Sequence, residues 1–253
     1  MAQLSSFWSE PSGSERLREN EIHVWLVRAD LGSYCIRCGH DLLSLSEQER
    51  ATRFKFEDDR RRYIVAHAVL RLLLSRYVNI SAGDLNFFAS ANGKPFLAAA
   101  PAAANIQFNL SHSHEVVLIA VTQGREIGVD VEWAKEGFAF GEVAERFFTA
   151  REVAALHALP SELQRKTFYR CWTSKEAFLK AKGIGLSGEL DEVVISFTPE
   201  EGVHISAIVP NWTLIELNPP HGYAGAVAVE GSEAEVKCFQ WQPPAYPWTH
   251  RHA

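Results

Sequence analysis

The sequence predicts an α+β protein built from two tandem, similar units, each a small, mostly antiparallel sheet packed against a long helix. Two long segments, residues 57–78 and 161–182, have the apolar spacing that is typical of helices. Short runs rich in β-branched and aromatic residues, typical of strands, accompany each of them. Residues 114–121 (HEVVLIAV) and 221–229 (HGYAGAVAV) also resemble one closing strand seen twice. We therefore expect a site where the two units meet.

The first unit opens with residues 22–27 (IHVWLV), whose composition favours a strand. In the helix at 57–78, apolar side chains such as Leu70 and Leu74 recur on one face, and acidic residues suit the first turn. Asn92-Gly93 marks a turn before Lys94. The strands expected next are residues 106–110, 115–122 and 126–133.

The second unit repeats this order of elements. A helical region at residues 146–159 leads to the long helix near 161–182. The strands expected after it are residues 193–197, 203–208, 212–217 and 223–229.

These elements predict four segments. They are an N-terminal leader (1–21), an N-terminal α+β half (22–122), a C-terminal α+β half with the metal site argued below (123–230), and a C-terminal strand with an aromatic and proline-rich tail (231–253). We expect the tail, residues 239–248, to pack on the surface.

The composition is that of an ordinary globular protein. The chain has 253 residues, of which 47% are hydrophobic and 22% charged, so wholesale disorder is excluded. A net charge of −6 argues against a protein made chiefly to bind nucleic acid. No apolar segment reaches the length of a membrane span, and residues 1–20 lack the order of a signal peptide. We expect a cytoplasmic protein with neither nucleic acid nor membrane as a partner.

The four cysteines are too few for a disulfide framework in a chain of this length. Cys35, Cys38 and His40 resemble half of a zinc knuckle, but no second pair of ligands completes it. Reduced cysteines in a loop are the favoured interpretation.

The sharpest local signal is residues 127–132 (IGVDVE). Side chains alternate along a strand, so Asp130 and Glu132 point to the same face. Two close carboxylates repel each other, and Mg²⁺, which prefers oxygen ligands, would relieve that repulsion. Gly128 would let a phosphate group approach the backbone. For these residues alone, two solvated acids on an exposed strand face remain the favoured interpretation.

The second signal lies in the long helix at residues 172–180 (WTSKEAFLK). Glu176 and Lys180 are four residues apart and share a helix face. A surface ion pair is the simplest interpretation. The alternative is that Glu176 is a third carboxylate for the metal ion, beside an ammonium group suited to a phosphoryl oxygen.

The third signal is residues 108–113 (FNLSHS), where His112 stands between two serines. A buried histidine with its hydrogen bonds satisfied is the usual case. No hydrolase triad accompanies it. Donation to a phosphate, together with Lys94 and the arginines at 60–62, is the alternative, although those arginines also suit a solvated helix end.

Taken together and in order, these motifs resemble the Sfp-type 4'-phosphopantetheinyl transferases, which activate carrier proteins. The resemblance runs from about Ile22 to Val229. The segments that carry it are RRRY at the start of the helix 60–71, NGKP (92–95), FNLSHS (108–113), IGVDVE (127–132), RFFTAREV (146–153) and WTSKEAFLKAKGIGL (172–186).

The resemblance implies a pseudodimer, hence a monomeric protein, with coenzyme A in the cleft between the halves. It implies transfer of the phosphopantetheine arm to a serine of an apo acyl, peptidyl or aryl carrier protein, with Mg²⁺ and with release of adenosine 3',5'-bisphosphate. Such carriers serve fatty acid, polyketide or nonribosomal peptide biosynthesis.

The resemblance also assigns roles to residues. Asp130, Glu132 and Glu176 match the Mg²⁺ ligands, and Lys180 a lysine that contacts phosphate. The residues matched to coenzyme A binding are Arg62, Lys94, Ser111 and His112, and Glu152 matches a glutamate sometimes proposed as the base. There are departures from the family pattern. They are Arg50 and Glu47, which stand at positions of phosphate-binding lysines, and His67, which stands where some relatives carry Arg or Asp.

The chemistry of phosphoryl transfer agrees with these residues, because it needs charge neutralisation and positioning more than a covalent nucleophile. Lys180 and Lys175 suit the charge that grows on the β-phosphate and on the leaving oxygen. Glu176, or Glu152 through a water molecule, suits the role of base for the serine proton.

Two other functions compete. An acyl-CoA-dependent acetyltransferase would also bind coenzyme A, and residues 123–128 (QGREIG) faintly resemble its pyrophosphate loop, but it does not need three carboxylates. A non-catalytic module that binds carrier proteins would tolerate the loss of Glu176.

A carrier protein that presents an acidic helix would need a local basic patch on this protein. The candidates for that patch are Arg165, Lys166, Arg170 and Lys182, beside Lys175.

Overall fold

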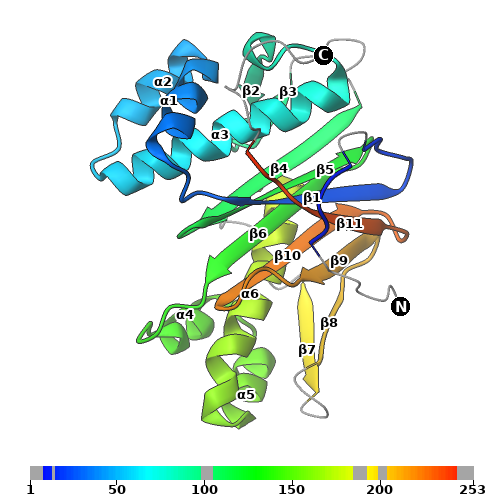
Figure 1. Ribbon diagram of the computed structural model, residues 1–253. Helices are drawn as coiled ribbons and strands as arrows, with labels where there is room; N and C mark the ends of the chain where they lie inside the picture. Colours follow the sequence, from blue (N-terminus) through cyan, green and yellow to red (C-terminus); the bar gives the residue numbers. More distant parts are fainter. Residues whose placement is uncertain (1–7, 13–14, 98–104, 185–192, 199–203, 244–253) are drawn as a thin grey trace.

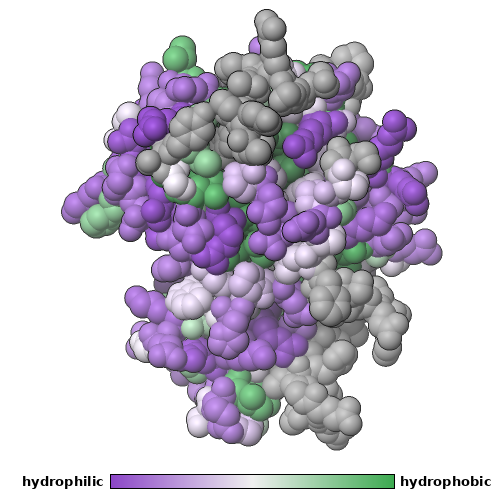
Figure 2. Space-filling view, viewed as in Figure 1, coloured by the Kyte–Doolittle hydropathy of each residue, from purple (hydrophilic) through white to green (hydrophobic). Residues whose placement is uncertain are grey.

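The structure is a computed structural model that describes residues 8–12, 15–97, 105–184, 193–198 and 204–243. In Figure 1 two sheets occupy the middle of the molecule, with the helices of the first half on one side and those of the second half on the other. None of the helices in these residues is long and apolar enough to cross a membrane. The face seen in Figure 2 is largely hydrophilic, with small separate hydrophobic patches.

In the described residues of the first half there are three α-helices and five strands. Its helices are α1 (Ser33–Leu42), α2 (Leu45–Thr52) and α3 (Glu57–Val78), followed by a single 3₁₀ turn at Ala82–Asp84. Its strands are β1 (Glu21–Arg28), the hairpin β2 (Phe87–Ala89) and β3 (Pro95–Leu97), β4 (Ile106–Ser113) and β5 (Val116–Gln123).

The part of the second half that the structure describes contains another three α-helices. They are α4 (Phe140–Phe147), α5 (Ala150–Ala158) and α6 (Ser161–Lys182). Its strands are β6 (Ile127–Trp133), β7 (Val194–Thr198), β8 (His204–Ile208), β9 (Trp212–Leu217) and β10 (Tyr223–Glu230), and the last strand of the chain is β11 (Glu235–Gln240).

The two halves have the same topology. In the first half, β5 lies between β1 and β4 and pairs with both in the antiparallel sense. In the second half, β10 lies between β6 and β9 in the same way. A helix of 22 residues packs on each sheet, α3 in the first and α6 in the second. The prediction of two tandem α+β units, closed by similar strands, is therefore confirmed.

Both long helices begin and end at the residues expected. The residue that caps the end of α3 is Asn79 and the one that caps α6 is Gly183, and both adopt the left-handed conformation, with φ of 53° and 67°. Such residues satisfy the last carbonyl groups of a helix while turning the chain away from it.

Three expectations were wrong in detail. The helical region at 146–159 is two helices, because Phe148 and Thr149 leave the helical conformation and Thr149 caps α5. The helices α1 and α2 were not predicted, and Cys35 and Cys38 lie in α1 as free thiols rather than in a loop. The tail does not simply pack on the surface, because β11 joins the first sheet.

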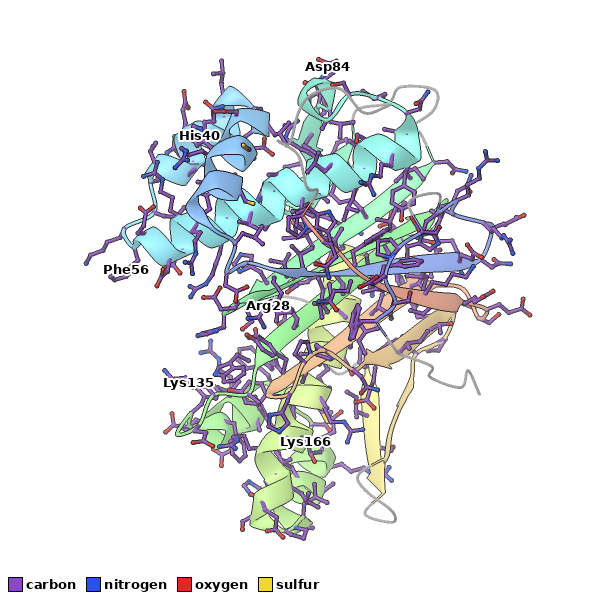
Figure 3. The ribbon with its side chains drawn as sticks, viewed as in Figure 1. Arg28, His40, Phe56, Asp84, Lys135 and Lys166 are labelled. Atoms are coloured by element: carbon purple, nitrogen blue, oxygen red, sulfur yellow. The ribbon has the colours of Figure 1, made fainter. Side chains whose placement is uncertain are left out.

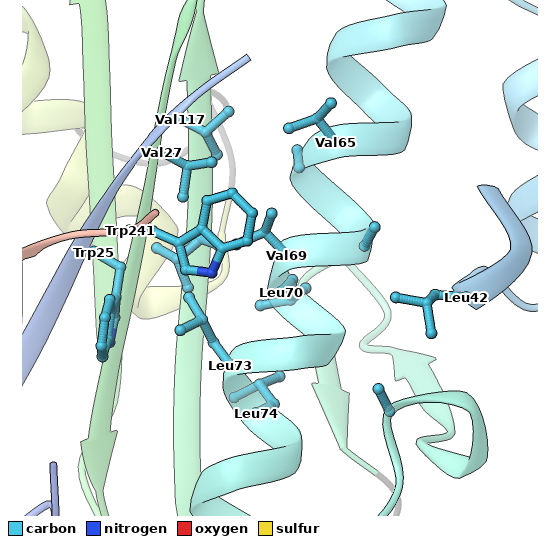
Figure 4. Packing of buried hydrophobic residues seen from close by; sticks show 14 of the residues in the cluster. Trp25, Val27, Leu42, Val65, Val69, Leu70, Leu73, Leu74, Val117 and Trp241 are labelled. Carbon is cyan, nitrogen blue, oxygen red and sulfur yellow. The ribbon is translucent and has the colours of Figure 1, made fainter. Parts of the chain in front are cut away.

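This C-terminal strand pairs in parallel with β1. Its Phe239 and the following Trp241 are only 9% and 5% exposed, in the core of the first half. Figure 4 shows the Trp241 ring between the strands and the α3 side chains Val69 and Leu73. Burial of aromatic surface thus fixes the end of the described chain to its beginning. Residues 244–248 of the tail lie outside the described residues.

Besides the core inside each half, a further apolar core fills the space between the two sheets. It contains Ile22 and Val24 of β1, Val129 of β6 and Val227 of β10, all fully buried. The two halves therefore share one continuous apolar layer, which brings β4, at the edge of the first sheet, beside β6, at the edge of the second. We propose that the halves meet in the turn between β5 and β6, as the boundaries 22–122 and 123–230 imply.

Candidate active site

The site lies where β4, β6 and α6 meet. On β6, Asp130 is 2% exposed, and its Oδ1 accepts hydrogen bonds from Ser111 Oγ at 2.8 Å and from Lys180 Nζ at 2.6 Å. Glu132, two residues further on the same face, accepts from Ser113 Oγ at 2.8 Å. The expectation that these two acids are merely solvated is wrong for Asp130, because it is buried.

Gly128 explains how α6 comes this close to β6. A Cβ atom at this position would collide with the Ala177 carbonyl oxygen and the Ala181 amide nitrogen of α6. The glycine therefore serves helix packing, and its expected role in admitting a phosphate is wrong. The close contact places Glu176 and Lys180, one helical turn apart, over the carboxylates of β6.

The carboxyl groups of this cluster, from Asp130, Glu132 and Glu176, outnumber the cationic group beside them, Lys180. Burial, followed by the negative charge of Asp130, raises the pKa of Glu176 to about 7. The same two causes raise the pKa of Glu132. Lys180 opposes both shifts but bonds only to Asp130 and Ser111 among the described residues. Two buried oxygens, Asp130 Oδ2 and Glu176 Oε1, have no hydrogen-bond partner there.

This donor set fits a hard divalent cation. Carboxylate oxygens are the ligands that Mg²⁺ prefers, and a cation would satisfy the two unpartnered oxygens and lower the mutual repulsion. In the described part of the chain, no three His, Cys, Asp or Glu side chains already converge as a metal site. The contact between Lys180 and Asp130 supplies the nearest positive charge in this structure.

A group of cationic and aromatic residues flanks the cluster on the side of the first half. His112 keeps exposed surface on β4, but the protein around its ring displaces part of the water, and this loss of solvation, followed by the positive charges of Lys180 and Arg62, lowers its pKa. Arg62 pairs with Asp59 at 2.9 Å and with Glu115 at 3.3 Å. The structure therefore brings His112 and Arg62 to the same side of the site, with Arg62 already engaged by two acids.

Arg50 lies further out, exposed on α2, with its guanidinium 5.6 Å from the Tyr63 ring centroid. The His67 ring lies against the same Tyr63 ring, tilted by 32° and with the two centroids 3.9 Å apart. The carboxylate of Glu47 is already paired, because it lies 2.7 Å from the guanidinium group of the buried Arg71.

Lys94 has a different position from the one expected. Its Nζ bonds Glu126 Oε2 at 2.6 Å and the Ala181 carbonyl at 2.7 Å. The hairpin turn of the first half is thereby attached to the start of β6 and the end of α6. In this structure Lys94 connects the two halves rather than lying open in a cleft.

Lys175 and Glu152 form a buried ion pair, with exposures of 0% and 2% and an N–O distance of 3.0 Å. Lys175 also donates to the Val193 carbonyl, and the two oxygens of Glu152 accept from the Ile195 and Thr149 amides. Neither side chain is open to a ligand here. The phosphate contact expected for Lys175 and the role of base expected for Glu152 do not agree with this arrangement.

The basic residues of α6 are partly engaged as well. Arg170 makes a bidentate pair with Glu216, at 2.7 and 2.8 Å, and Arg165 lies 3.7 Å from Glu136. Lys182 lies 5.3 Å from the Phe178 ring. Lys166 is exposed on the outer side of α6 (Figure 3).

Comparison with known proteins identifies the family. Residues 126–228 match the model of the 4'-phosphopantetheinyl transferase superfamily, and residues 36–124 that of the 4'-phosphopantetheinyl transferase N-terminal region. The chain is 36% identical over 240 residues to the 4'-phosphopantetheinyl transferase HetI of Nostoc sp., which covers 95% of this chain and 98% of that protein. The chain belongs to the 4'-phosphopantetheinyl transferase superfamily.

Two further relatives carry the same activity in their names. The 4'-phosphopantetheinyl transferase Sfp of Bacillus subtilis is 32% identical over 64% of this chain and 70% of its own length. The human L-aminoadipate-semialdehyde dehydrogenase-phosphopantetheinyl transferase is 29% identical over 60% of this chain and 52% of its own length. This chain is thus an enzyme, a 4'-phosphopantetheinyl transferase, as the order of its motifs predicted.

Proposed function

We propose that this transferase moves the 4'-phosphopantetheine arm of coenzyme A to a serine hydroxyl of an apo carrier protein, with Mg²⁺, and releases adenosine 3',5'-bisphosphate. The carrier is of the acyl, peptidyl or aryl type. The observation that carries the proposal is the cluster of Asp130, Glu132 and Glu176 beside Lys180, at the junction of the two halves of a member of this family.

We propose that Asp130, Glu132 and Glu176 hold the Mg²⁺ ion. When bound, the ion would offset the negative charge of the pyrophosphate and orient it for in-line displacement. Asp130 Oδ2 and Glu176 Oε1, both buried and unpartnered within the described residues, support this assignment.

Lys180 is the proposed phosphate contact. Its side chain is 30% exposed, so its ammonium group can turn from Asp130 toward a bound pyrophosphate. His112 and Arg62 are proposed to hold the nucleotide phosphates of coenzyme A, with Ser111 beside them. An anionic phosphate would favour the charged form of His112, which has a lowered pKa without it. Arg50 and Lys94 are proposed only as outer contacts.

Glu176 is the better supported of the two proposed bases. Its Oε1 has no hydrogen-bond partner in the described part of the chain, so this carboxylate is still open to a ligand or to a proton donor. Both oxygens of Glu152 are occupied by main-chain amides, and one also by Lys175.

A monomer in the cytoplasm is the proposed working form. One chain supplies β4, β6 and α6, which together form the site. The four cysteines are free thiols, which agrees with a reducing compartment.

The test is to incubate the purified protein with coenzyme A and an apo carrier protein, with Mg²⁺ or with a chelator, and to measure the intact mass of the carrier. We expect the carrier to gain one phosphopantetheine group only when Mg²⁺ is present. No mass change would indicate a non-catalytic carrier-binding module. Acetylation by acetyl-CoA without this gain would indicate the acetyltransferase.

A further inference from the structure

The strands β4 and β6 lie side by side but are joined by side chains instead of a main-chain ladder. Each is the edge of its own sheet, and the pairings described for them are with β5 and β10. Three amides of β6 donate instead to side chains of β4. Val129 N donates to Asn109 Oδ1 at 2.9 Å, Val131 N to Ser111 Oγ at 3.4 Å, and Trp133 N to Ser113 Oγ at 3.0 Å.

The three bonds follow a regular pattern. On both strands every second residue takes part, so each side chain of β4 bonds the amide twenty residues later. This is the period of a β-strand, whose alternate side chains point to one face. We call the three residues Asn109, Ser111 and Ser113 the β4 zipper.

The two serines of the β4 zipper make a second bond to a carboxylate. Ser111 Oγ donates to Asp130 and Ser113 Oγ donates to Glu132, both at 2.8 Å. A hydroxyl group can accept from an amide and donate to an acid at once, because it has one hydrogen and two lone pairs. Asn109, the remaining residue of the zipper, has no acid to bond, because Gly128 stands on β6 where the serines meet Asp130 and Glu132. Its Oδ1 only accepts, from the Val129 amide.

We propose that Ser113, which no motif assignment singled out, is a positioning residue that orients Glu132 for the metal ion, and that Ser111 does the same for Asp130. The inference rests on the proposed function. The same oxygen atoms fix β4 to β6, so the relation between the two halves and the direction of the two carboxylates are set together. Groups that bond to metal ligands in this way commonly change metal affinity 10- to 100-fold when they are removed.

Ser113 is the better residue to test, because Ser111 also contacts Lys180 at 2.9 Å. The variants Ser113→Thr and Ser113→Val differ in one hydroxyl group and have the same shape and the same β-branching. A matched control is Thr122→Val on β5. It removes a fully buried hydroxyl group of the same half, which donates to the main-chain carbonyl of Glu21 at 2.9 Å and not to a proposed metal ligand.

The experiment measures the binding of Mn²⁺, as a probe for Mg²⁺, by electron paramagnetic resonance, with coenzyme A present and the carrier absent. Thermal unfolding of each variant is recorded in parallel. We expect Ser113→Val to weaken Mn²⁺ binding about 10-fold and Ser113→Thr to stay within about threefold of the natural protein. Thr122→Val should lower the unfolding temperature without changing the affinity for Mn²⁺.

Equal Mn²⁺ affinity of Ser113→Val and Ser113→Thr would overturn the inference, as would an equal loss in Thr122→Val or an absence of Mn²⁺ binding in the natural protein. If Ser113→Val does not fold, Ser113→Ala takes its place in the same comparison. Failure of the inference and of the proposed function remain distinguishable. A natural protein that modifies the carrier while Ser113→Val binds Mn²⁺ normally refutes only the positioning role.

Discussion

The helices α3 and α6 occupy equivalent places in the two halves, and each carries one buried cation at the same position. Arg71 and Lys175 both lie fourteen residues after the first residue of their helix, with exposures of 1% and 0%. Each pairs with a glutamate, Glu47 or Glu152, from the short helix that precedes it. Each also donates to main-chain carbonyl groups.

The two glutamates are equivalent as well. Glu47 forms a capping box with Ser44 at the start of α2, and Glu152 forms one with Thr149 at the start of α5. The pair therefore occurs twice, once in the first half, to which none of the three proposed metal ligands belongs. This repetition indicates that the pair of Lys175 and Glu152 stabilises the fold, as that of Arg71 and Glu47 does.

What differs is the residue next to the cation. In α6 the buried lysine is followed by Glu176, and Lys180 comes one turn later. In α3 the corresponding residues are Leu72 and Arg76. The duplicated scaffold thus holds both helices in place, and a few substitutions on one of them provide the acidic site.

The largest effect we expect is on stability. Removing the cation from either pair, in Lys175→Met or Arg71→Met, should lower the free energy of unfolding by about 3–5 kcal/mol, because it leaves a buried carboxylate without its partner. Urea denaturation measures this loss. A small loss in one variant and a large loss in the other would break the equivalence of the two pairs.

The companion variants Glu152→Gln and Glu47→Gln sharpen the comparison. If both glutamates are structural, turnover per folded molecule should fall by a similar and small factor in each. A large fall in turnover confined to Glu152→Gln, with the fold intact, would restore Glu152 as the base.

The next effect concerns the metal ligands. Asp130→Ala and Glu176→Ala should each lower turnover by at least about 10²-fold, because each removes a negative charge from the proposed Mg²⁺ site. Leu72→Ala, at the position in α3 that corresponds to Glu176, is the control and should affect stability more than turnover per folded molecule. If Asp130→Ala or Glu176→Ala kept the turnover of the natural protein at saturating Mg²⁺, the proposed metal site would be contradicted.

Periodicity and composition were sufficient to predict most of this fold. The bounds of α3 and α6 followed from long apolar repeats, because one face of each helix must be buried. The helices α2 and α5 carry a detectable signal, the spacing of Ser44 to Glu47 and of Thr149 to Glu152, which is that of a capping box.

The site was predictable only in part. The acids Asp130, Glu132 and Glu176 stood out by their spacing, and the structure brings them to one region. The burial of Lys175 was not predictable from local pattern, since lysine is seldom buried and its partner is 23 residues away. The alternation of Asn109, Ser111 and Ser113 was visible, but the sequence does not say which strand lies opposite.

A smaller effect is expected on the dependence of stability on pH. The pKa of Glu176 is about 7 in the metal-free fold, above its usual value of 4.5, so folding favours the protonated form. This contribution is fully present below about pH 4.5 and is lost as the pH rises toward 7. We expect a loss of about 2 kcal/mol, allowing for partial exposure.

Urea denaturation in a chelator at several pH values measures this loss, and Glu176→Gln should remove most of it. Leu72, the corresponding residue of α3, has no ionisable group, so Leu72→Ala should leave the pH dependence of stability unaltered. A stability that rises between pH 5 and 7 through the Glu176 carboxyl would contradict the sign of the pKa shift.

The binding of coenzyme A should respond more weakly still. His112→Ala and Arg62→Ala should each raise the KM for coenzyme A about 10-fold, the loss of one charge-assisted contact. Dephospho-coenzyme A, which lacks the ribose phosphate, tests which phosphate is bound. If His112→Ala raises the KM by the same factor for coenzyme A and for dephospho-coenzyme A, then His112 does not contact the ribose phosphate.

The smallest effect is expected at the basic residues on and around α6, because the carrier protein is predicted to dock across the cleft beside this helix. The structure leaves fewer candidates for the basic patch that would bind the carrier, because Arg170 pairs with Glu216 and Lys175 is buried. Lys166 and Lys182 are exposed, and the side chain of Arg165, next to Lys166, is 40% exposed. Reversing both charges, in Arg165→Glu with Lys166→Glu, should raise the KM for the carrier severalfold and leave the KM for coenzyme A unchanged.

Salt separates this docking effect from a loss of fold. Attraction between an acidic carrier helix and these two side chains weakens with ionic strength, so the variant should show a flatter dependence of carrier KM on salt than the natural protein. The matched change on α3 is Arg76→Glu, which alters an exposed charge on the equivalent helix of the other half. An equal rise in carrier KM for Arg76→Glu would point to the overall charge of the protein, and an unchanged KM in the double variant at low salt would place the carrier elsewhere.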